Sequence, residues 1–193
     1  MKPMPSEVTW SAYVHDLRVL VSAVRLLVDE VTSAPGAAED TRDTLRDNVD
    51  LLSEVLRLLS EIEEGEEEGV SNADARAIVW MSRARHPEAF MGKMPAPVWV
   101  RTNVRTLLDL LDVTVGWVRG SVSRVKIVAV QRPPALFIVG APTPHEPLQE
   151  VPHDRETEQA IMSLAGAARV EVTLRPSPRS ATIEFLSADD DED

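Results

Sequence analysis

The sequence predicts an α+β protein in which an N-terminal helical hairpin precedes a small α/β sandwich. Apolar residues recur at the three- and four-residue spacing of amphipathic helices over about residues 6–32 and 39–63. The acidic stretch Glu63–Gly69 then interrupts this periodicity. Beyond residue 98, two further helical segments are each followed by a pair of short segments rich in apolar residues, which is typical of strands.

The first predicted helix runs from about Ser6 to Thr32 and ends before the turn sequence at residues 33–36. Its inward stripe consists of Tyr13, Leu17, Leu20, Val24, Leu27 and Val31. At about 100° per residue, His15 points away from this stripe. Since Asp16 and Arg18 lie beside it, this outward histidine is a candidate nucleophile rather than a core residue.

The second predicted helix begins at about residues 39–41 and runs to about Glu63. It carries two apolar stripes, one of Leu45, Val49, Leu52, Leu56 and Leu59 and another of Leu51, Val55, Leu58 and Ile62. A contact with one helix needs only one stripe, and a hairpin alone buries little apolar surface. We therefore expect two hairpins to form a dimeric four-helix bundle. The alternative is that the second stripe packs on the C-terminal domain of the same chain.

Four regions follow from these patterns: a hairpin at 1–64, a linker with a short helix at 65–97, an α/β domain at 98–187 and an acidic disordered tail at 188–193. The short helix is expected from Ala73 to about Arg85, capped by Ser71 or Asn72. The α/β domain is predicted as helix 100–119, strands 122–130 and 136–139, helix 155–165 ending at Gly166, and strands 170–174 and 181–185. This α-β-β-α-β-β order predicts helices on one face of a mixed sheet.

Composition excludes several classes of function. The chain has no cysteine, so it cannot form a disulfide or a cysteine zinc site, and its four histidines lack metal-ligand spacing. A net charge of −12 disfavours binding to nucleic acid. The apolar runs are too short to span a membrane, and no signal peptide pattern opens the chain. We expect a cytoplasmic protein without metal, membrane or nucleic acid.

A hairpin that carries His15-Asp16-Leu17-Arg18, followed by an α/β unit, resembles the catalytic core of two-component histidine kinases. The resemblance implies that the hairpin is a dimerisation and phosphotransfer domain containing the H-box. It implies that the second unit has the fold of the kinase ATP-binding domain. Only the H-box matches at the level of a motif.

The motifs with which such kinases bind ATP are not found at the corresponding positions. The asparagine-bearing helix corresponds to residues 109–114, where Val113 replaces an expected asparagine. The aspartate-glycine turn corresponds to residues 138–142 and has no aspartate. The glycine loop that would surround the phosphates is also missing, because residues 142–165 contain no glycine. We expect this domain to keep the fold and to bind no nucleotide cofactor.

The resemblance therefore points to the small dimeric histidine phosphotransferases of bacterial phosphorelays, such as the sporulation-initiation phosphotransferase of bacilli and the alphaproteobacterial cell-cycle phosphotransferase. It implies that His15 passes phosphoryl groups between receiver-domain aspartates, with Asp16 setting the imidazole tautomer and Arg18 supplying charge. Mg²⁺ is expected only on the receiver partner. Val19 and Leu20 replace the polar residue and the proline of kinases, so we expect a straight helix without phosphatase activity.

Val19, Ser22 and Leu26 lie on the same side as His15 and form a predicted docking surface for response regulator receivers. The alternative is that this side leans on the second domain. The rival function is non-catalytic, a dimeric adaptor or pseudokinase that binds and regulates a signalling partner. An ATP-dependent kinase is the third possibility.

Overall fold

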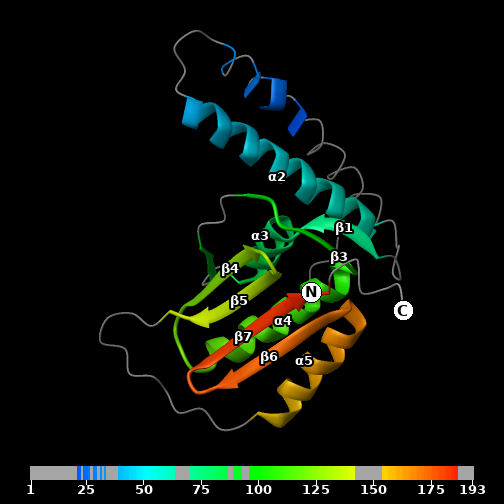
Figure 1. Cartoon of the computed structure of the whole chain (residues 1–193), viewed down its shortest axis with the longest axis vertical. Helices are drawn as coiled ribbons and strands as arrows, with labels where there is room; N and C mark the ends of the chain where they lie inside the picture. Colours follow the sequence, from blue (N-terminus) through cyan, green and yellow to red (C-terminus); the bar gives the residue numbers. More distant parts are fainter. Residues whose placement is uncertain are drawn as a thin grey trace, which may run out of the picture. The chain divides into compact units, whose positions relative to one another are not determined.

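The computed structural model describes residues 21–22, 24–26, 28–29, 31, 33, 39–63, 70–86, 89–92, 96–141 and 154–186 (Figure 1). The chain divides into two units, Met1–Glu66 and Glu67–Asp193. The first unit is helical at its described positions, and the second contains every described strand.

The first unit is an antiparallel helical hairpin. The described residues between Val21 and Ser33 are helical and form helix 1, and α2 spans Glu39–Glu63. Arg25 Nη2 lies 3.3 Å from Asp50 Oδ1, whereas Val21 shares a hollow with Leu56, which lies further along α2. Because an earlier residue of helix 1 lies beside a later residue of α2, the two helices run antiparallel.

The inward stripe predicted for helix 1 is wrong at two described positions. Val24 is 43% exposed and Val31 is 55% exposed in the single chain. The reason is the orientation of the helix: Val21 and Arg25 turn toward α2, which places Val24 and Val31 about a quarter of a turn away.

The second stripe on α2 is also covered in part without a second copy of the chain. Val55 and Leu58 are buried in the single chain, with 4% and 0% exposed. These two residues therefore do not support the dimer that the second stripe was used to predict.

The second unit contains two sheets and three helices at its described positions. The elements are β1 (Ser71–Asp74), α3 (Ala75–Arg85), β2 (Ala89–Met91), β3 (Trp99–Thr102), α4 (Val104–Arg119), β4 (Val125–Gln131), β5 (Pro134–Gly140), α5 (Arg155–Ala168), β6 (Val170–Pro176) and β7 (Arg179–Phe185). The larger sheet has the strand order β2-β4-β5-β7-β6, with β2 parallel to β4 and the other pairs antiparallel. From α4 to β7 the order is the α-β-β-α-β-β that the sequence predicts.

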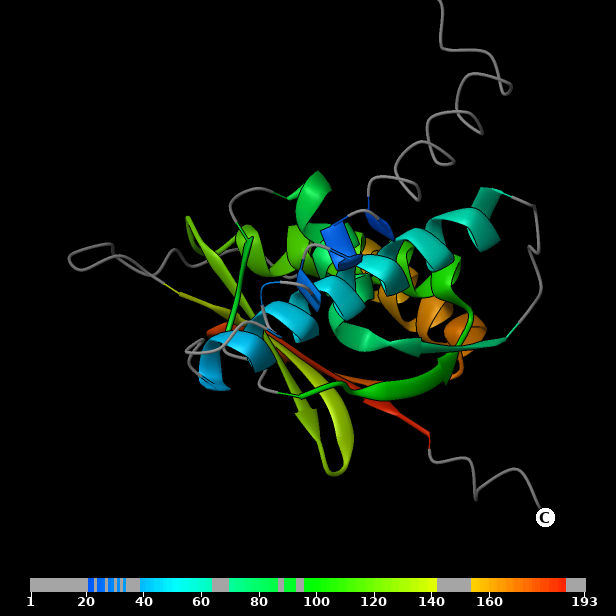
Figure 2. The ribbon, with the colours of Figure 1, turned by 90° about the horizontal axis from the view of Figure 1, so that it is seen from above.

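One face of the larger sheet carries the core. Figure 2 shows α4 and α5 on the same side of this sheet, and α4 contacts both α5 and the central strands. Alternation along the strands directs one set of side chains to these helices. The largest fully buried side chains of this core are Ile127, Leu136, Ile138 and Ile183 from the sheet and Leu107, Leu110, Leu111, Val115 and Ile161 from the helices.

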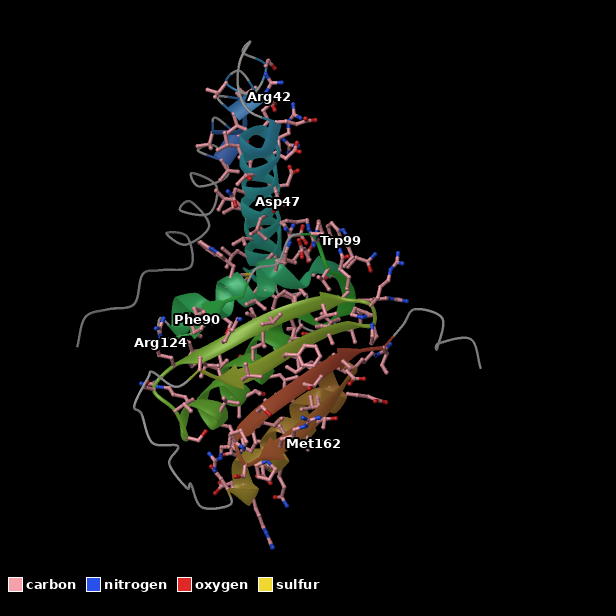
Figure 3. The ribbon with its side chains drawn as sticks, turned by 60° about the vertical axis from the view of Figure 1, so that its left-hand side comes forward. Arg42, Asp47, Phe90, Trp99, Arg124 and Met162 are labelled. Carbon is pink, nitrogen blue, oxygen red and sulfur yellow. The ribbon has the colours of Figure 1, made fainter. Side chains whose placement is uncertain are left out.

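The segment predicted as a linker with a short helix, 65–97, contains that helix as α3 and also the strands β1 and β2, which were not predicted. β1 pairs antiparallel with β3, from Ser71 opposite Thr102 to Asp74 opposite Trp99. β2 joins the larger sheet through β4, and the Arg124 guanidinium lies over the Phe90 ring, 5.0 Å from its centre (Figure 3). Strand pairing over a distance of about 30 residues leaves no signature in the local sequence, which explains why this segment resembled a linker.

Three predicted helix boundaries are wrong for related reasons. The short helix begins at Ala75, because Asp74 rather than Ser71 or Asn72 accepts a hydrogen bond from the Arg76 backbone N–H at 3.0 Å. The next helix begins at Val104, after the Asn103 side chain, which accepts from Thr106 N at 2.9 Å. α5 continues past Gly166 to Ala168, since Ala165 and Ala168 extend its buried stripe.

Replacing Asp74 by alanine should destabilise the second unit by about 3 kcal/mol, because it removes one partner of a buried ion pair. Asp74 Oδ2 accepts from Arg76 Nε at 2.8 Å, and Asp74 Oδ1 accepts from the Val98 backbone N–H at 3.1 Å. Urea unfolding followed by tryptophan fluorescence measures the change. The control is Asp109→Ala on the exposed side of α4, where we expect a change within about 0.5 kcal/mol. Equal unfolding midpoints for the two variants would contradict this role of Asp74.

Candidate functional site

The predicted site residues are only partly within the described chain. His15, Asp16, Arg18 and Val19 lie outside the described residues. Ser22 and Leu26 are described, and both are exposed, Leu26 to 71%. Their helix therefore presents a polar and an apolar side chain to solvent on the side where the sequence places the docking surface.

Helix 1 has three distinguishable sides. Val21 and Arg25 face α2, Ser22 and Leu26 face solvent on one side, and Val24 and Val31 are exposed on the other. At about 100° per residue, the two exposed sides lie roughly a quarter of a turn or more from the contact with α2, in opposite directions. One exposed side is thus mixed in polarity and the other is apolar.

The helix α2 has three corresponding sides and a further side that carries the buried Val55 and Leu58. Val49, Ser53 and Leu56 face helix 1. Up to a quarter of a turn to one side lie the half-buried Leu45, Leu52 and Leu59, and about a fifth to a third of a turn or more to the other side lie Arg57, Glu61 and Glu54. Because the two helices are antiparallel and right-handed, the same sense of rotation on each leads to the same side of the hairpin.

The hairpin consequently has two opposite surfaces. We name the apolar surface made of Val24, Val31, Leu45, Leu52 and Leu59 the leucine face. We name the surface made of Ser22, Leu26, Glu54, Arg57 and Glu61 the charged face. An open hollow of about 310 Å³ lies on the charged side, lined by Val21, Ser22, Ser53, Leu56 and Arg57.

The charged face is organised around Arg57. Arg57 donates through Nε and Nη2 to the two carboxylate oxygens of Glu54, at 2.8 and 2.7 Å, and through Nη1 to Glu61. The Glu54 side chain is 12% exposed, Glu61 is 29% exposed and Arg57 is 39% exposed. The hydrogen bond to Glu54, aided by the charges of both carboxylates, raises the pKa of Arg57 above its ordinary value against the opposing effect of burial. The guanidinium is therefore charged at any pH at which the protein would be assayed.

Sequence reasoning missed this cluster. Its signal is the spacing Glu54, Arg57, Glu61, which places both carboxylates within one turn of the arginine on a helix. That spacing is common on solvated helix surfaces, so it gains meaning only when the structure shows which side of the hairpin it occupies.

In the second unit, the helix that corresponds to the kinase asparagine box turns one acid toward α3. Asp109 is exposed, whereas Asp112 Oδ1 lies 3.4 Å from both His86 Nε2 and Ser82 Oγ. Ser82 is fully buried. Asp112 is thus engaged with the end of α3, and these residues serve packing between α3 and α4.

The glycine at the end of β5 also has a packing role. A Cβ at Gly140 would lie 2.9 and 3.0 Å from the two methyl carbons of Val122. The next residue, Ala141, donates its backbone N–H to Arg124 O at 2.9 Å. The turn that corresponds to the kinase aspartate-glycine turn is closed by these local contacts. The segment that follows, 142–153, lies outside the described residues.

A second hollow lies beside the β4–β5 turn, with a volume of about 250 Å³. It is lined by Pro97, Val98, Trp99, Gln131, Arg132 and Pro134. The side chain of Trp99, labelled in Figure 3, is 61% exposed, whereas Trp117 is buried with 3% exposed. An indole this exposed beside an arginine is typical of binding surfaces.

Two searches of the described residues gave negative results. Among the part of the chain that the structure describes, no group of three or more His, Asp or Glu side chains could hold a metal ion. None of the described helices is both long and apolar enough to cross a membrane.

No protein-family model matches the sequence, and no curated protein matches it. The structural neighbours are histidine kinase cytoplasmic segments and a bacterial phosphotransferase. The Acinetobacter baumannii histidine kinase AdeS aligns with 18% identity and a TM-score of 0.44, over 90% of this chain and 98% of that chain. The cytoplasmic segment of histidine kinase QseC aligns with 10% identity and a TM-score of 0.44, over 97% and 98%. A bacterial phosphotransferase aligns with 11% identity and a TM-score of 0.36, over 96% and 98%. TM-scores this low carry no argument about activity.

Proposed function

We propose that this protein is a histidine phosphotransferase of a bacterial two-component phosphorelay, which moves phosphoryl groups between receiver-domain aspartates through His15. The observation that carries the proposal is the orientation of helix 1. Ser22 and Leu26 are exposed on the charged face, and His15 lies two and three helical turns before them in the sequence. On a continuous helix all three side chains share one side.

Phosphoryl transfer between aspartates requires little more than an accessible imidazole at His15. A lone pair on one imidazole nitrogen of His15 forms a bond to phosphorus while the bond from phosphorus to the aspartyl oxygen breaks, and the receiver aspartate leaves as a carboxylate. The proton on the other ring nitrogen remains there, and Asp16 stabilises the positive charge that the ring acquires. Transfer to a second aspartate is the reverse reaction. Positioning and charge stabilisation supply most of the catalysis, and the receiver contributes its own Mg²⁺.

The proposed assembly is a dimer in which the leucine faces of two hairpins meet as a four-helix bundle. Both helices carry apolar residues on this side, including Val24 and Val31, which are exposed in the single chain. A second copy supplies a matching apolar face through a twofold axis. The charged faces of both hairpins then remain on the outside of the bundle, where receivers can reach them.

The second unit is proposed to keep the layered α/β fold of a kinase ATP-binding domain without its nucleotide chemistry. Gly140 packs on Val122 and Asp112 is engaged with His86, so each residue has a structural role at its position. A non-catalytic adaptor is the second candidate function. The hollow beside Trp99 favours it, because an exposed indole next to Arg132 can bind a protein partner without any phosphoryl transfer.

The chain should be a dimer at micromolar concentration, and Val24→Asp should raise the dimer dissociation constant by about tenfold or more, since a buried valine contributes about 1.5 kcal/mol. Light scattering over a dilution series measures this constant. The matched control is Leu26→Asp, an equally drastic change on the charged face, which should leave the dimer intact. A monomeric wild type, or dissociation by Leu26→Asp alone, would contradict the proposed interface.

Mg-ATP should show no heat of binding in calorimetry at micromolar concentrations of the full chain. The reason is that Val113 stands where an asparagine is expected, residues 138–142 contain no aspartate, and no glycine occurs in 142–165. ADP and a non-hydrolysable analogue are the appropriate parallel titrations. A micromolar site for any of these nucleotides would favour the ATP-dependent kinase.

A phosphorylated receiver should transfer its phosphoryl group to the wild-type chain, and His15→Gln should abolish this labelling. The phosphorylated chain should lose the group in acid and retain it in base, as phosphohistidine does. Dimer mass and helix content should not change, because an exposed substitution rarely costs more than about 0.5 kcal/mol. The control is His153→Gln, and Leu26→Glu should weaken receiver binding while the nucleophile stays intact. Wild-type chain that no host receiver labels would favour the adaptor, and labelled His15→Gln would place the nucleophile elsewhere.

A further inference from the structure

We infer that the outer edge of β6 pairs with β6 of a second copy of this chain, as an antiparallel continuation of the larger sheet. The strand order β2-β4-β5-β7-β6 places β6 at one end of that sheet, beside β7 (Figure 1), and no other described strand pairs with it. A seven-residue edge strand presents backbone donors and acceptors that another strand can use. The inference concerns the second unit and does not depend on the proposed function.

Hydrogen bonds across the sheet identify the residues of β6 that face the open edge. Ala141 donates its backbone N–H to Arg124 O at 2.9 Å, next to the first residues paired between β4 and β5. In an antiparallel ladder, the backbone groups of successive residues turn alternately to the two sides of the strand. Followed through β5 and β7, this alternation directs residues 171, 173 and 175 toward β7 and the even-numbered residues from 170 to 176 outward. Pro176, which has no N–H, stands at the end of this outward row.

One register lets two copies pair through these outward groups and also match their charges. When Thr173 lies opposite Thr173 of the second copy, Glu171 of each copy lies opposite Arg175 of the other. Residues 172 and 174 then also lie opposite each other and exchange backbone hydrogen bonds. A shift of two residues keeps the backbone match but moves Glu171 opposite Thr173 or Ser177, so both charge pairs are lost. The twofold axis through Thr173 makes the edge complementary to itself.

The side chains on both faces of β6 suit this register. Glu171, Thr173 and Arg175 are exposed on the open face of the sheet, and the half-buried Val172 and Leu174 lie on the face that carries the helices. The second copy would place its Leu174 beside Val172 and its Val172 beside Leu174. Opposite charges therefore meet on one face and apolar side chains meet on the other.

A like-charge pair within the chain also favours a second copy at this edge. Glu171 lies directly opposite the exposed Glu184 of β7. Like charges directly opposite each other destabilise a sheet. Arg175 of a second copy would lie on the other side of Glu171 and offset this repulsion. Edges that stay unpaired are commonly protected by lysines, bulges or inward-pointing charges, and β6 has none of these.

Cysteine cross-linking of the full chain tests the register. The chain has no cysteine, so a disulfide-linked dimer of the Thr173→Cys variant joins position 173 of two copies. In the proposed register these positions form a non-hydrogen-bonded pair with a Cα separation of about 4.5 Å, which a disulfide spans. We expect mild oxidation to link most of this variant, and to link little of Glu184→Cys, an exposed position one strand away. Equal cross-linking of the two variants would overturn the register.

Charge reversal tests the partner, in full chain that carries Val24→Asp so that the proposed hairpin contact is weakened. Sedimentation should show reversible association at about 0.1 mM protein. Glu171→Arg and Arg175→Glu should each weaken it by about tenfold or more, because two opposite-charge pairs become two like-charge pairs. An equimolar mixture of these two variants regains two opposite-charge pairs and should associate as strongly as the unreversed chain.

The mixture separates edge pairing from a structural effect, because damage to the fold of either variant would not be repaired by mixing. Arg132→Glu, an exposed charge reversal at the other hairpin turn of this sheet, is the matched control and should not change the association. No association of the unreversed chain, unchanged association of the single variants, or no recovery in the mixture would each overturn the proposal. A hairpin that fails to dimerise leaves these expectations as they are, so the two interfaces are judged separately.

Discussion

The side on which the two helices of the hairpin touch is the constraint that organises the first unit. Val21 on helix 1 shares a hollow with Leu56 on α2, and the Arg25–Asp50 pair fixes which residues lie opposite each other. Helical geometry then assigns the exposed and half-buried positions beside this contact to two surfaces, while the buried Val55 and Leu58 lie on the far side of α2. An apolar surface and a charged surface on opposite sides let one hairpin associate with a copy of itself and still offer a reactive side to other proteins.

The second unit is stabilised in a different way, because helices of the same chain cover one face of its sheet. Ile127, Leu136 and Ile183 project from neighbouring strands toward α4, and Thr102 Oγ1 donates to Ala168 O at 3.0 Å, which ties β3 to the end of α5. These contacts join the sheet to its helices through side chains and backbone of the chain itself.

Elements with a local periodic pattern were predicted from the sequence, whereas strands that form by pairing with a distant segment were missed. The order of elements from α4 to β7 follows from helical and alternating patterns near each element. Strand β1 could not be predicted, since Ser71–Asp74 becomes a strand only by pairing with β3, and the alternation of Trp99–Thr102 was hidden by the helix that follows. The candidate site shows the same division: Leu26 was correctly placed in solvent, whereas Arg57 became visible only when the hairpin brought α2 beside helix 1.

The two proposals for the hairpin depend on each other through geometry. A dimer formed through Val24, Val31 and the leucines of α2 would cover the leucine face. The charged face around Arg57 would then stay exposed on both helices and accessible to a partner. Had the charged cluster occupied the same side as those valines, a dimer would have buried Arg57 together with two carboxylates, at a high desolvation cost. The separation of the surfaces is therefore a condition for a dimeric phosphotransferase, and the described part of the hairpin meets it in both helices.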